Sequence, residues 1–510
     1  MTRERLALLS ILALAACLRF TALDYGRGID ARPDEPGVVL ALSTLSPFGS
    51  VSPTLPLYDA GFLIPLYAFV RAARAGAWWL RSVPLDERFD VLVLARSWSA
   101  VLSLATVWMV YRVGRRAGGT SVGLIAAAWL AVCPLAVREA HSAKADTAAA
   151  FAIALLLHLA TRQWKAPRGR ALALGAAAGL AVSTKWMIGI LPAFAYALAA
   201  DVGDRTTMRV QLRRGILAFG VVTIALHWYL VVQPQWLRLL PGLLHAVRHA
   251  DWLPGGDQVP GPLRYHLTVS LRFGCGLLLT VLAPISLGYG IARPGAPRLI
   301  AIAVVGLYLP LLASSMVLAR FLLPAVPGLL VLGTMVLARV SDWLPRRHYL
   351  RAAVCGLAAA ALLEPFYDSV MIVRLLRRTD TRIEAGAWLA EHTPTGSHVV
   401  CWGAPGLADF GSPPLPNMVV RRGLPPAQWE AFGAQWVIWH HYPLPYSSVP
   451  LPPLPPTFER AAVFSPFSGP TNAPVLEPLD AFYLPLAHFD GIVRPGPYIE
   501  VYRLTYGPVS

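Results

Sequence analysis

The feature that most constrains this chain is a series of long apolar blocks separated by short basic loops. Hydrophobic residues fill 56% of the 510 positions and charged residues only 14%, against roughly 25% charged residues in soluble domains. Many blocks approach the ~20 residues that an α-helix needs to cross a bilayer. The blocks cover approximately residues 6–23, 61–80, 91–111, 120–136, 146–161, 171–183, 186–200, 215–233, 270–292, 299–317, 321–340 and 351–370. They predict a mainly α-helical, polytopic membrane protein.

The positions of the basic residues predict the topology. Arg3 and Arg5 place the N-terminus in the cytoplasm. If block 61–80 lies along the outer membrane surface instead of crossing, five basic loops fall inside, and if it crosses, all five fall outside. Arg71 and Arg74 inside that block also suit an interfacial helix. The expectation is therefore about eleven transmembrane helices, a multi-pass protein of the inner (plasma) membrane.

The net charge of +16 is explained by these loops, and no basic patch interleaved with aromatics indicates nucleic-acid binding. The five cysteines form no CxxC pair and imply neither a disulfide framework nor a zinc finger. Leu14-Ala15-Ala16-Cys17 resembles a lipoprotein cleavage box, but the apolar stretch continues to Leu23. We therefore expect an uncleaved signal anchor that forms the first span.

Two domains are expected, a membrane region of residues 1–370 and an extracytoplasmic α/β domain of residues 371–510. The outer loops of the membrane region are predicted at 24–90, 137–145 and 234–269. Block 171–200 is read as two short spans with a tight turn at Ser183-Thr184-Lys185. In the last domain we expect a Pro-rich surface loop over 443–475. The other elements predicted there are a helix over Thr381–His392 and strands over His398–Trp402, Gln435–His440 and Tyr498–Leu504.

Asp34 and Glu35 follow the first span in Arg32-Pro33-Asp34-Glu35. Pro33 pre-orders a helix start, so both carboxylates fit the first helical turn, where capping and the helix dipole account for them equally well. The functional alternative is a general base at the membrane surface, which would take the proton from an attacking acceptor hydroxyl or amine.

Arg138, His141 and Asp146 gather in an expected outer loop that runs into an apolar helix. Ionisable groups at membrane depth are costly and hence candidates for function, although a helix cap also explains Asp146. Lys185 and Arg320 each interrupt apolar stretches. Either residue could simply extend to the interface, or hold a phosphate whose charge develops as a sugar departs.

His245 and His249 are four residues apart, a spacing that suits a metal on one helix face but also arises by chance. The sequence contains no P-loop, GxSxG, HExxH or dinucleotide fingerprint.

The order of these outer motifs resembles that of the GT-C membrane glycosyltransferases. The quoted features are Pro-Asp-Glu after the first span, Tyr58-Asp59 before a surface helix, the Arg…His…Asp loop, Gly-Leu-Ala-Val-Ser-Thr-Lys-Trp and Arg-Phe-Leu-Leu-Pro-Ala-Val-Pro. These motifs are similar to those of the branch that contains the protein O-mannosyltransferases and the lipid A aminoarabinose transferase. The resemblance covers roughly residues 1–340, and the last domain matches more loosely.

The resemblance implies a GT-C fold and transfer of a sugar from a polyprenyl-phosphate carrier in one inverting displacement. It gives Asp34, with Glu35 beside it, the role of base, and places Asp146 in the same site. Lys185 and Arg320 correspond to cations near the lipid phosphate, and Arg138, His141 and Tyr58 to other substrate contacts. The resemblance does not decide the acceptor. A protein, lipid A, a cell-wall polymer and another glycan all remain open.

A metal is also left open. The aminoarabinose branch implies a divalent ion held at Asp59 and His249, but Asp stands where that branch has Glu, and its following Lys-Pro is absent. The mannosyltransferase branch implies no metal.

Two other classes of function compete with the enzyme. A lipid-linked sugar transporter or flippase would need polar or broken helices at the bilayer midplane and two similar halves. A non-enzymatic membrane protein would have no need to bring Asp34 and Asp146 to one outer cavity.

Overall fold

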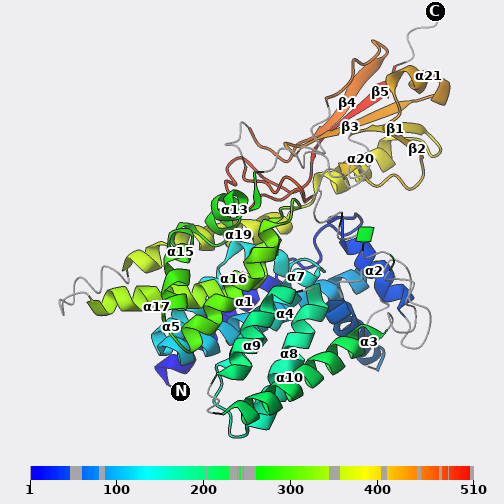
Figure 1. Ribbon diagram of the computed structural model, residues 1–510. Coiled ribbons are helices and arrows are strands. Elements are labelled where there is room, and N and C mark those ends of the chain that lie inside the picture. Colours follow the sequence, from blue (N-terminus) through cyan, green and yellow to red (C-terminus); the bar gives the residue numbers. More distant parts are fainter. Residues whose placement is uncertain are drawn as a thin grey trace, which may run out of the picture. The chain divides into compact units, whose positions relative to one another are not determined.

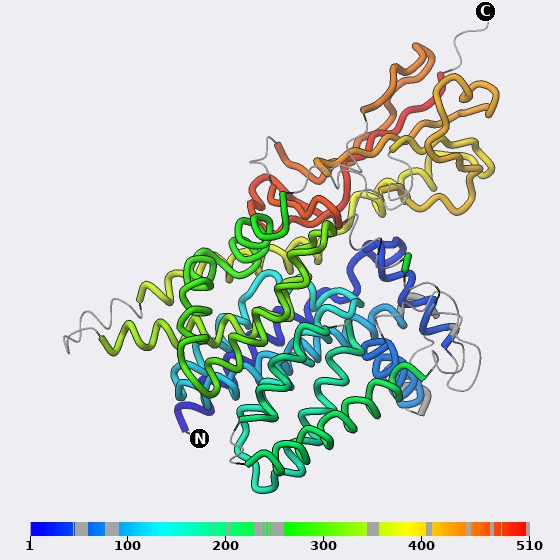
Figure 2. The backbone as a smooth tube through the Cα atoms, in the orientation of Figure 1, coloured from blue at the N-terminus to red at the C-terminus, as the bar shows by residue number. Residues whose placement is uncertain are grey.

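The structure is a computed structural model, and its backbone trace is shown in Figure 2. The described residues are 2–45, 60–79, 87–185, 187–200, 204–228, 238, 241–242, 245, 260–343, 356–403, 411–444, 450–469, 474–480 and 482–505. The chain divides into two compact units. The first takes in most residues before Met371, and the second joins Asp24–Pro36 to Met371–Ser510.

The first unit is helical (Figure 1). Its early helices are α1 (Arg3–Phe20), α2 (Glu35–Thr44, which begins in the second unit), α3 (Ala60–Trp79), α4 (Glu87–Gly118), α5 (Thr120–Ala131), α6 (Pro134–Ala140), α7 (Ala145–Ala160), α8 (Pro167–Lys185), η1 (Ile188–Ile190), α9 (Leu191–Ala199) and α10 (Arg205–Leu226). The later ones are α13 (Pro262–Tyr265), η5 (His266–Leu271), α14 (Arg272–Gly274), α15 (Leu277–Ala292), α16 (Ala296–Leu312), η6 (Ala319–Ala325), α17 (Val326–Trp343) and α19 (Leu363–Leu376). A break inside block 171–200 is confirmed, since α8 ends at Lys185. The predicted tight turn at Ser183-Thr184-Lys185 was wrong, because these three residues form the last turn of α8.

Helix α7 packs against several other helices of this unit. It packs against α4, α8 and η6, and α8 in turn lies along α10 (Figure 1). Small residues permit this closeness, as is usual between helices in membranes. A Cβ on Gly175 of α8 would lie 2.1 Å from the carbonyl oxygen of Gly215, and one on Gly61 of α3 would lie 2.7 Å from the backbone nitrogen of Thr184. Helix α3 therefore touches α8 directly before Lys185.

A buried arginine holds the bend between α5 and α6, whose axes differ by 57°. A helix end leaves carbonyl oxygens without intrahelical partners. Arg19 of α1 donates to two of them, the carbonyls of Leu130 and Ala131, at 2.8 Å each, and its Nε donates to Ser103 at 2.8 Å. Arg19 has no solvent exposure. Its charge is thus spread over the turn that leads into α6 and α7.

Among the described residues, three helical segments are long and apolar enough to cross a membrane, or up to four if the bent α5–α6 pair is one span. The three are Val91–Gly118, Ala319–Trp343 and Gly356–His392. Helices α7, η1–α9, α15 and α16 are apolar but shorter. The expected count of about eleven spans stays a prediction.

The second unit contains a mixed five-stranded sheet with the order β2-β1-β3-β5-β4. Its strands are β1 (His398–Trp402), β2 (Val419–Arg422), β3 (Trp436–His441), β4 (Phe458–Phe464) and β5 (Tyr498–Leu504), and its helices are α20 (Thr381–His392), η8 (Pro426–Gln428) and α21 (Trp429–Phe432). Strand β1 pairs parallel with β2 and β3, while β5 pairs antiparallel with β3 and β4.

Two apolar layers enclose this sheet. On one face, Ala385 and Leu389 of α20 pack against Val399, Ile438 and other residues of the central strands. On the other face, Trp429 of α21 packs with Val400 and Val437. The α20 helix begins where expected because Asp380 caps it, accepting from the backbone N–H of Arg382 at 2.9 Å.

The expected α/β elements of this unit are confirmed, with one error. Helix α20 and strands β1 and β5 have the predicted bounds, and β3 is shifted by one residue. The prediction of a surface loop across 443–475 was wrong, because Phe458–Phe464 forms β4. This is an edge strand with mostly exposed side chains, so its sequence lacks the apolar alternation of a half-buried strand.

His440 makes the stability of the second unit depend on pH. Burial, together with the charges of Arg382 and Arg422, lowers the pKa of His440 from 6.5 to about 4. The His440 ring is therefore protonated below about pH 6.5 in the unfolded chain but only below about pH 4 in the folded chain. The free energy of unfolding consequently decreases as the pH falls from 6.5 to 4. At pH 5 we expect a loss of about 2 kcal/mol relative to pH 7.

Pulse proteolysis of the full chain in urea, followed by mass spectrometry of cleavage within β3, measures this loss. The variant His440→Gln cannot titrate, so its stability should change less between pH 7 and pH 5. An equal change in both proteins would contradict the assignment to His440.

Candidate active site

Asp146 lies in the first turn of α7, and Lys185 is the last residue of α8. The partial positive charge at a helix N-terminus favours a carboxylate, and the negative end favours an ammonium group. Both charges thus stand at the helix ends that stabilise them. Since α7 and α8 pack together, the two ends meet, and Lys185 Nζ donates to Asp146 Oδ1 in a short ion pair.

Arg320 joins this pair from η6. Its Nε lies 3.7 Å from Asp146 Oδ2. The ring of Phe321 contacts both cations, with Lys185 Nζ 4.4 Å and the Arg320 guanidinium carbon 5.9 Å from its centroid. Cations gain from facing an aromatic ring, particularly where water is scarce. The structure therefore brings three of the sequence candidates together and adds Phe321, which the sequence reading missed although it follows Arg320 directly.

The Asp146–Lys185–Arg320 cluster is nearly enclosed by protein. The side chain of Asp146 is 3% exposed, that of Arg320 10% and that of Lys185 16%. Two cations against one carboxylate leave an excess of positive charge among these three groups. Charges in such a setting are weakly screened because water is largely excluded.

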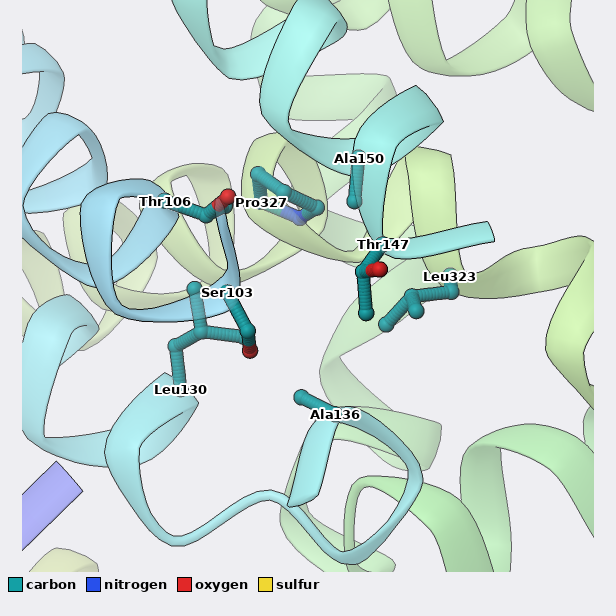
Figure 3. Close-up of a pocket in the computed structure, with 8 residues that line it drawn as sticks. All are labelled: Ser103, Thr106, Leu130, Ala136, Thr147, Ala150, Leu323 and Pro327. Carbon is teal, nitrogen blue, oxygen red and sulfur yellow. The ribbon is translucent and has the colours of Figure 1, made fainter. Parts of the chain in front are cut away.

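A small cavity lies among helices that include α7 and η6, the elements that carry Asp146 and Arg320 (Figure 3). Its lining includes Thr147, next to Asp146 in α7, and Leu323 of η6, with Ser103 and Thr106 of α4 opposite. It has room for roughly one water molecule. Ligand pockets usually need a few hundred Å³, so this cavity is a feature of the packing and not the place of a sugar.

Arg138 and His141 are both buried. His141 has no exposed surface, and its ring nitrogens lie 2.8 Å from the carbonyl oxygen of Val137 and 2.9 Å from that of Thr21. Arg138 is 3.4 Å from Glu139. The expected outer loop 137–145 differs in the structure, because its first four residues finish α6 and the whole segment is buried. The predicted substrate contacts of both residues remain predictions.

Asp34 and Glu35 belong to the second unit. Glu35 is the first residue of α2 and is 2% exposed, whereas Asp34 precedes the helix and is exposed. The helix thus starts close to the predicted place. The role of Asp34 as a base stays a prediction.

The predicted Tyr58 contact and the predicted metal ligands Asp59 and His249 lie outside the described residues. Within the part of the chain that is described, no group of three or more His, Cys, Asp or Glu side chains is arranged to hold a metal ion.

Comparison with known proteins identifies the fold. A family model described as dolichyl-phosphate-mannose-protein mannosyltransferase matches residues 90–230. Among solved structures, the chain is similar to the archaeal oligosaccharyltransferase AglB from Archaeoglobus fulgidus in complex with an inhibitory peptide and a dolichol-phosphate. The TM-score is 0.52 at 13% identity, over 84% of this chain and 69% of that one. The chain has the GT-C fold.

A second GT-C structure, ArnT from Cupriavidus metallidurans bound to undecaprenyl phosphate, is similar with a TM-score of 0.48 at 15% identity, over 75% of this chain and 72% of that one. The search of curated proteins finds no significant match. The apolar helices support a multi-pass membrane protein. The family match includes Asp146 and Lys185 but ends before Arg320.

Proposed function

We propose that this GT-C protein transfers a sugar from a polyprenyl-phosphate carrier to an acceptor on the extracytoplasmic side of the inner (plasma) membrane. The observation that carries the proposal is the Asp146–Lys185–Arg320 cluster, in which two cations converge from different elements in an almost enclosed setting. A lipid phosphate is the anion that the related structures bind, since AglB is in complex with a dolichol-phosphate and ArnT with undecaprenyl phosphate.

The proposed reaction is a single inverting displacement. The acceptor oxygen or nitrogen attacks the anomeric carbon, and its proton passes to the Asp34 carboxylate. The bond between that carbon and the phosphate oxygen breaks, and the electron pair leaves with the polyprenyl phosphate. Lys185 and Arg320 bind the charge that develops on this leaving group, while Asp146 holds the two cations in place.

The carrier and the acceptor follow from this reaction. The activated sugar-phosphate bond supplies the driving force, so the proposal needs no nucleotide. The acceptor is a protein, a lipid or a glycan. We place the N-terminus in the cytoplasm and residues 371–510 outside, because that arrangement keeps the short basic loops in the cytoplasm. Asp59 and His249 remain the proposed ligands if a divalent metal takes part.

A transfer assay tests this function. The full chain, reconstituted in lipid vesicles, is offered a panel of polyprenyl-phosphate sugars and, in parallel, the corresponding nucleotide sugars with mixed cell-envelope acceptors. Transfer from at least one lipid-linked sugar and from none of the nucleotide sugars is the expected result. Movement of the intact lipid-linked sugar across the vesicle membrane without transfer would replace the enzyme with the transporter alternative.

A further inference from the structure

The segment that carries Asp34 is held by a buried ion pair within the second unit. Arg32, two residues before Asp34, has no exposed surface, and its Nη2 lies 3.0 Å from Asp480 Oδ2. The guanidinium of Arg32 also faces the ring of Phe482, with its carbon 4.3 Å from the ring centroid. The planar guanidinium thus uses its charge toward one residue and its flat face toward another, which a lysine cannot do.

Two further contacts tie the same segment to residues beyond Met371. The ring of Tyr25 packs against Phe482 with a centroid distance of 6.0 Å. The backbone carbonyl of Asp30 accepts a long hydrogen bond of 3.5 Å from Arg382, whose guanidinium is held by both carboxylate oxygens of Asp380 at 2.8 and 2.7 Å. The segment is therefore held at Tyr25, Asp30 and Arg32.

The backbone transmits this hold to the predicted base. The carbonyl oxygen of Arg32 accepts from the backbone N–H of Glu35 at 3.3 Å, which closes the turn that contains Asp34 and starts α2. Fixing Arg32 thus fixes both ends of the turn. Placement matters for a general base, because an error of about 1 Å can cost 10²-fold in rate.

We propose that Arg32, Asp480 and Phe482 form a clamp that positions the Asp34 turn for catalysis, so that residues beyond Met371 act as a positioning element. The inference rests on the proposed function, because it gives Asp34 the role of base. Arg32 and Asp480 are positioning residues, since they act through the turn and not on the substrate.

The test combines a structural and a kinetic measurement on the full chain in lipid vesicles. Asp480→Asn removes the charge opposite Arg32, and we expect faster amide hydrogen exchange in residues 24–36 together with a 10- to 100-fold lower kcat, roughly the scale of a misplaced catalytic group. The KM for the carrier should change less than about threefold, because the loss falls on the chemical step and not on carrier binding.

Two further variants complete the design. Arg32→Lys keeps the charge but loses the flat stacking on Phe482. Its kcat and its exchange rates in residues 24–36 should therefore lie between those of wild type and Asp480→Asn. This variant carries the test if Asp480→Asn fails to fold. The matched control is Glu384→Gln, which breaks the half-buried ion pair between Glu384 and Arg494 elsewhere in the same unit. In this control, the amide hydrogen exchange of residues 24–36 and kcat should both be unchanged.

The outcomes separate this clamp from the proposed function. Unchanged exchange in residues 24–36, or faster exchange with unchanged kcat, would overturn the clamp as a positioning device while the enzyme stands. A wild-type chain that transfers sugar from no lipid carrier would overturn the proposed function, and the catalytic meaning of the clamp with it. In that case the exchange data still decide whether the segment is held.

Discussion

Replacing Asp34 by Asn should lower kcat for sugar transfer by about 10²-fold or more, the usual scale for losing a general base. The amide has nearly the same shape as the carboxylate but cannot take up the proton that the attacking acceptor group loses. Because Asp34 is exposed, the change should leave the melting temperature of the protein within a few degrees of wild type. The measurement is the turnover of wild type and variant with the best lipid-linked donor of the panel.

Asp24→Asn is the matched control for this prediction. Asp24 begins the same segment of the second unit and is also exposed, but the proposed reaction gives it no role. It should turn over at the wild-type rate. Asp34→Glu should retain more activity than Asp34→Asn because it keeps a carboxylate. Equal turnover by wild type and Asp34→Asn would exclude Asp34 as the base.

Replacing Lys185 by Gln should lower kcat by about 10²- to 10³-fold, the cost typical of losing one group that stabilises charge in the transition state. The loss should appear in kcat more than in the KM for the carrier, since the phosphate gains most of its negative charge as the sugar departs. Lys185→Arg keeps the positive charge and should retain most of the rate.

Stability must be separated from catalysis in this variant. Lys185→Gln leaves the buried Asp146 with Arg320 at 3.7 Å, and an incompletely paired buried carboxylate is destabilising. The double variant Asp146→Asn with Lys185→Gln removes that buried carboxylate charge. It should be more stable than Lys185→Gln, but its kcat should stay as low. Arg272→Gln, which breaks the more exposed pair of Arg272 with Glu364, is the control. Wild-type turnover by folded Lys185→Gln would refute the role of Lys185.

The sequence allowed much of the second unit to be predicted because its signals are local. Asp380 marks the start of α20, and the β-branched and aromatic residues of β1, β3 and β5 mark half-buried strands. Strand β4 was missed because Pro residues surround it and Glu459 and Arg460 interrupt its apolar pattern. An edge strand owes its place to pairing with β5, which no local pattern records.

The same reasoning explains what could be predicted of the site. Asp146, Lys185 and Arg320 stand out because charges are expensive beside apolar helices, and the structure places them together. Their roles remain predictions. Arg32 is visible in the sequence, but its partner is not, because Asp480 lies 448 residues later and sits in a segment without regular periodicity. Buried contacts of this range follow only from the packed fold.

The separation of Arg32 from Asp480 has a consequence for how the protein is made. Asp480 is synthesised 448 residues after Arg32, so the ion pair that holds the turn after α1 cannot form until Asp480 has been made. During synthesis the turn therefore lacks this ion pair for a long stretch of translation. A polypeptide that stalls before Asp480 would lack a fixed Asp34 turn, and on the proposal that Asp34 is the base, such truncated copies would be inactive before they could compete with the finished protein.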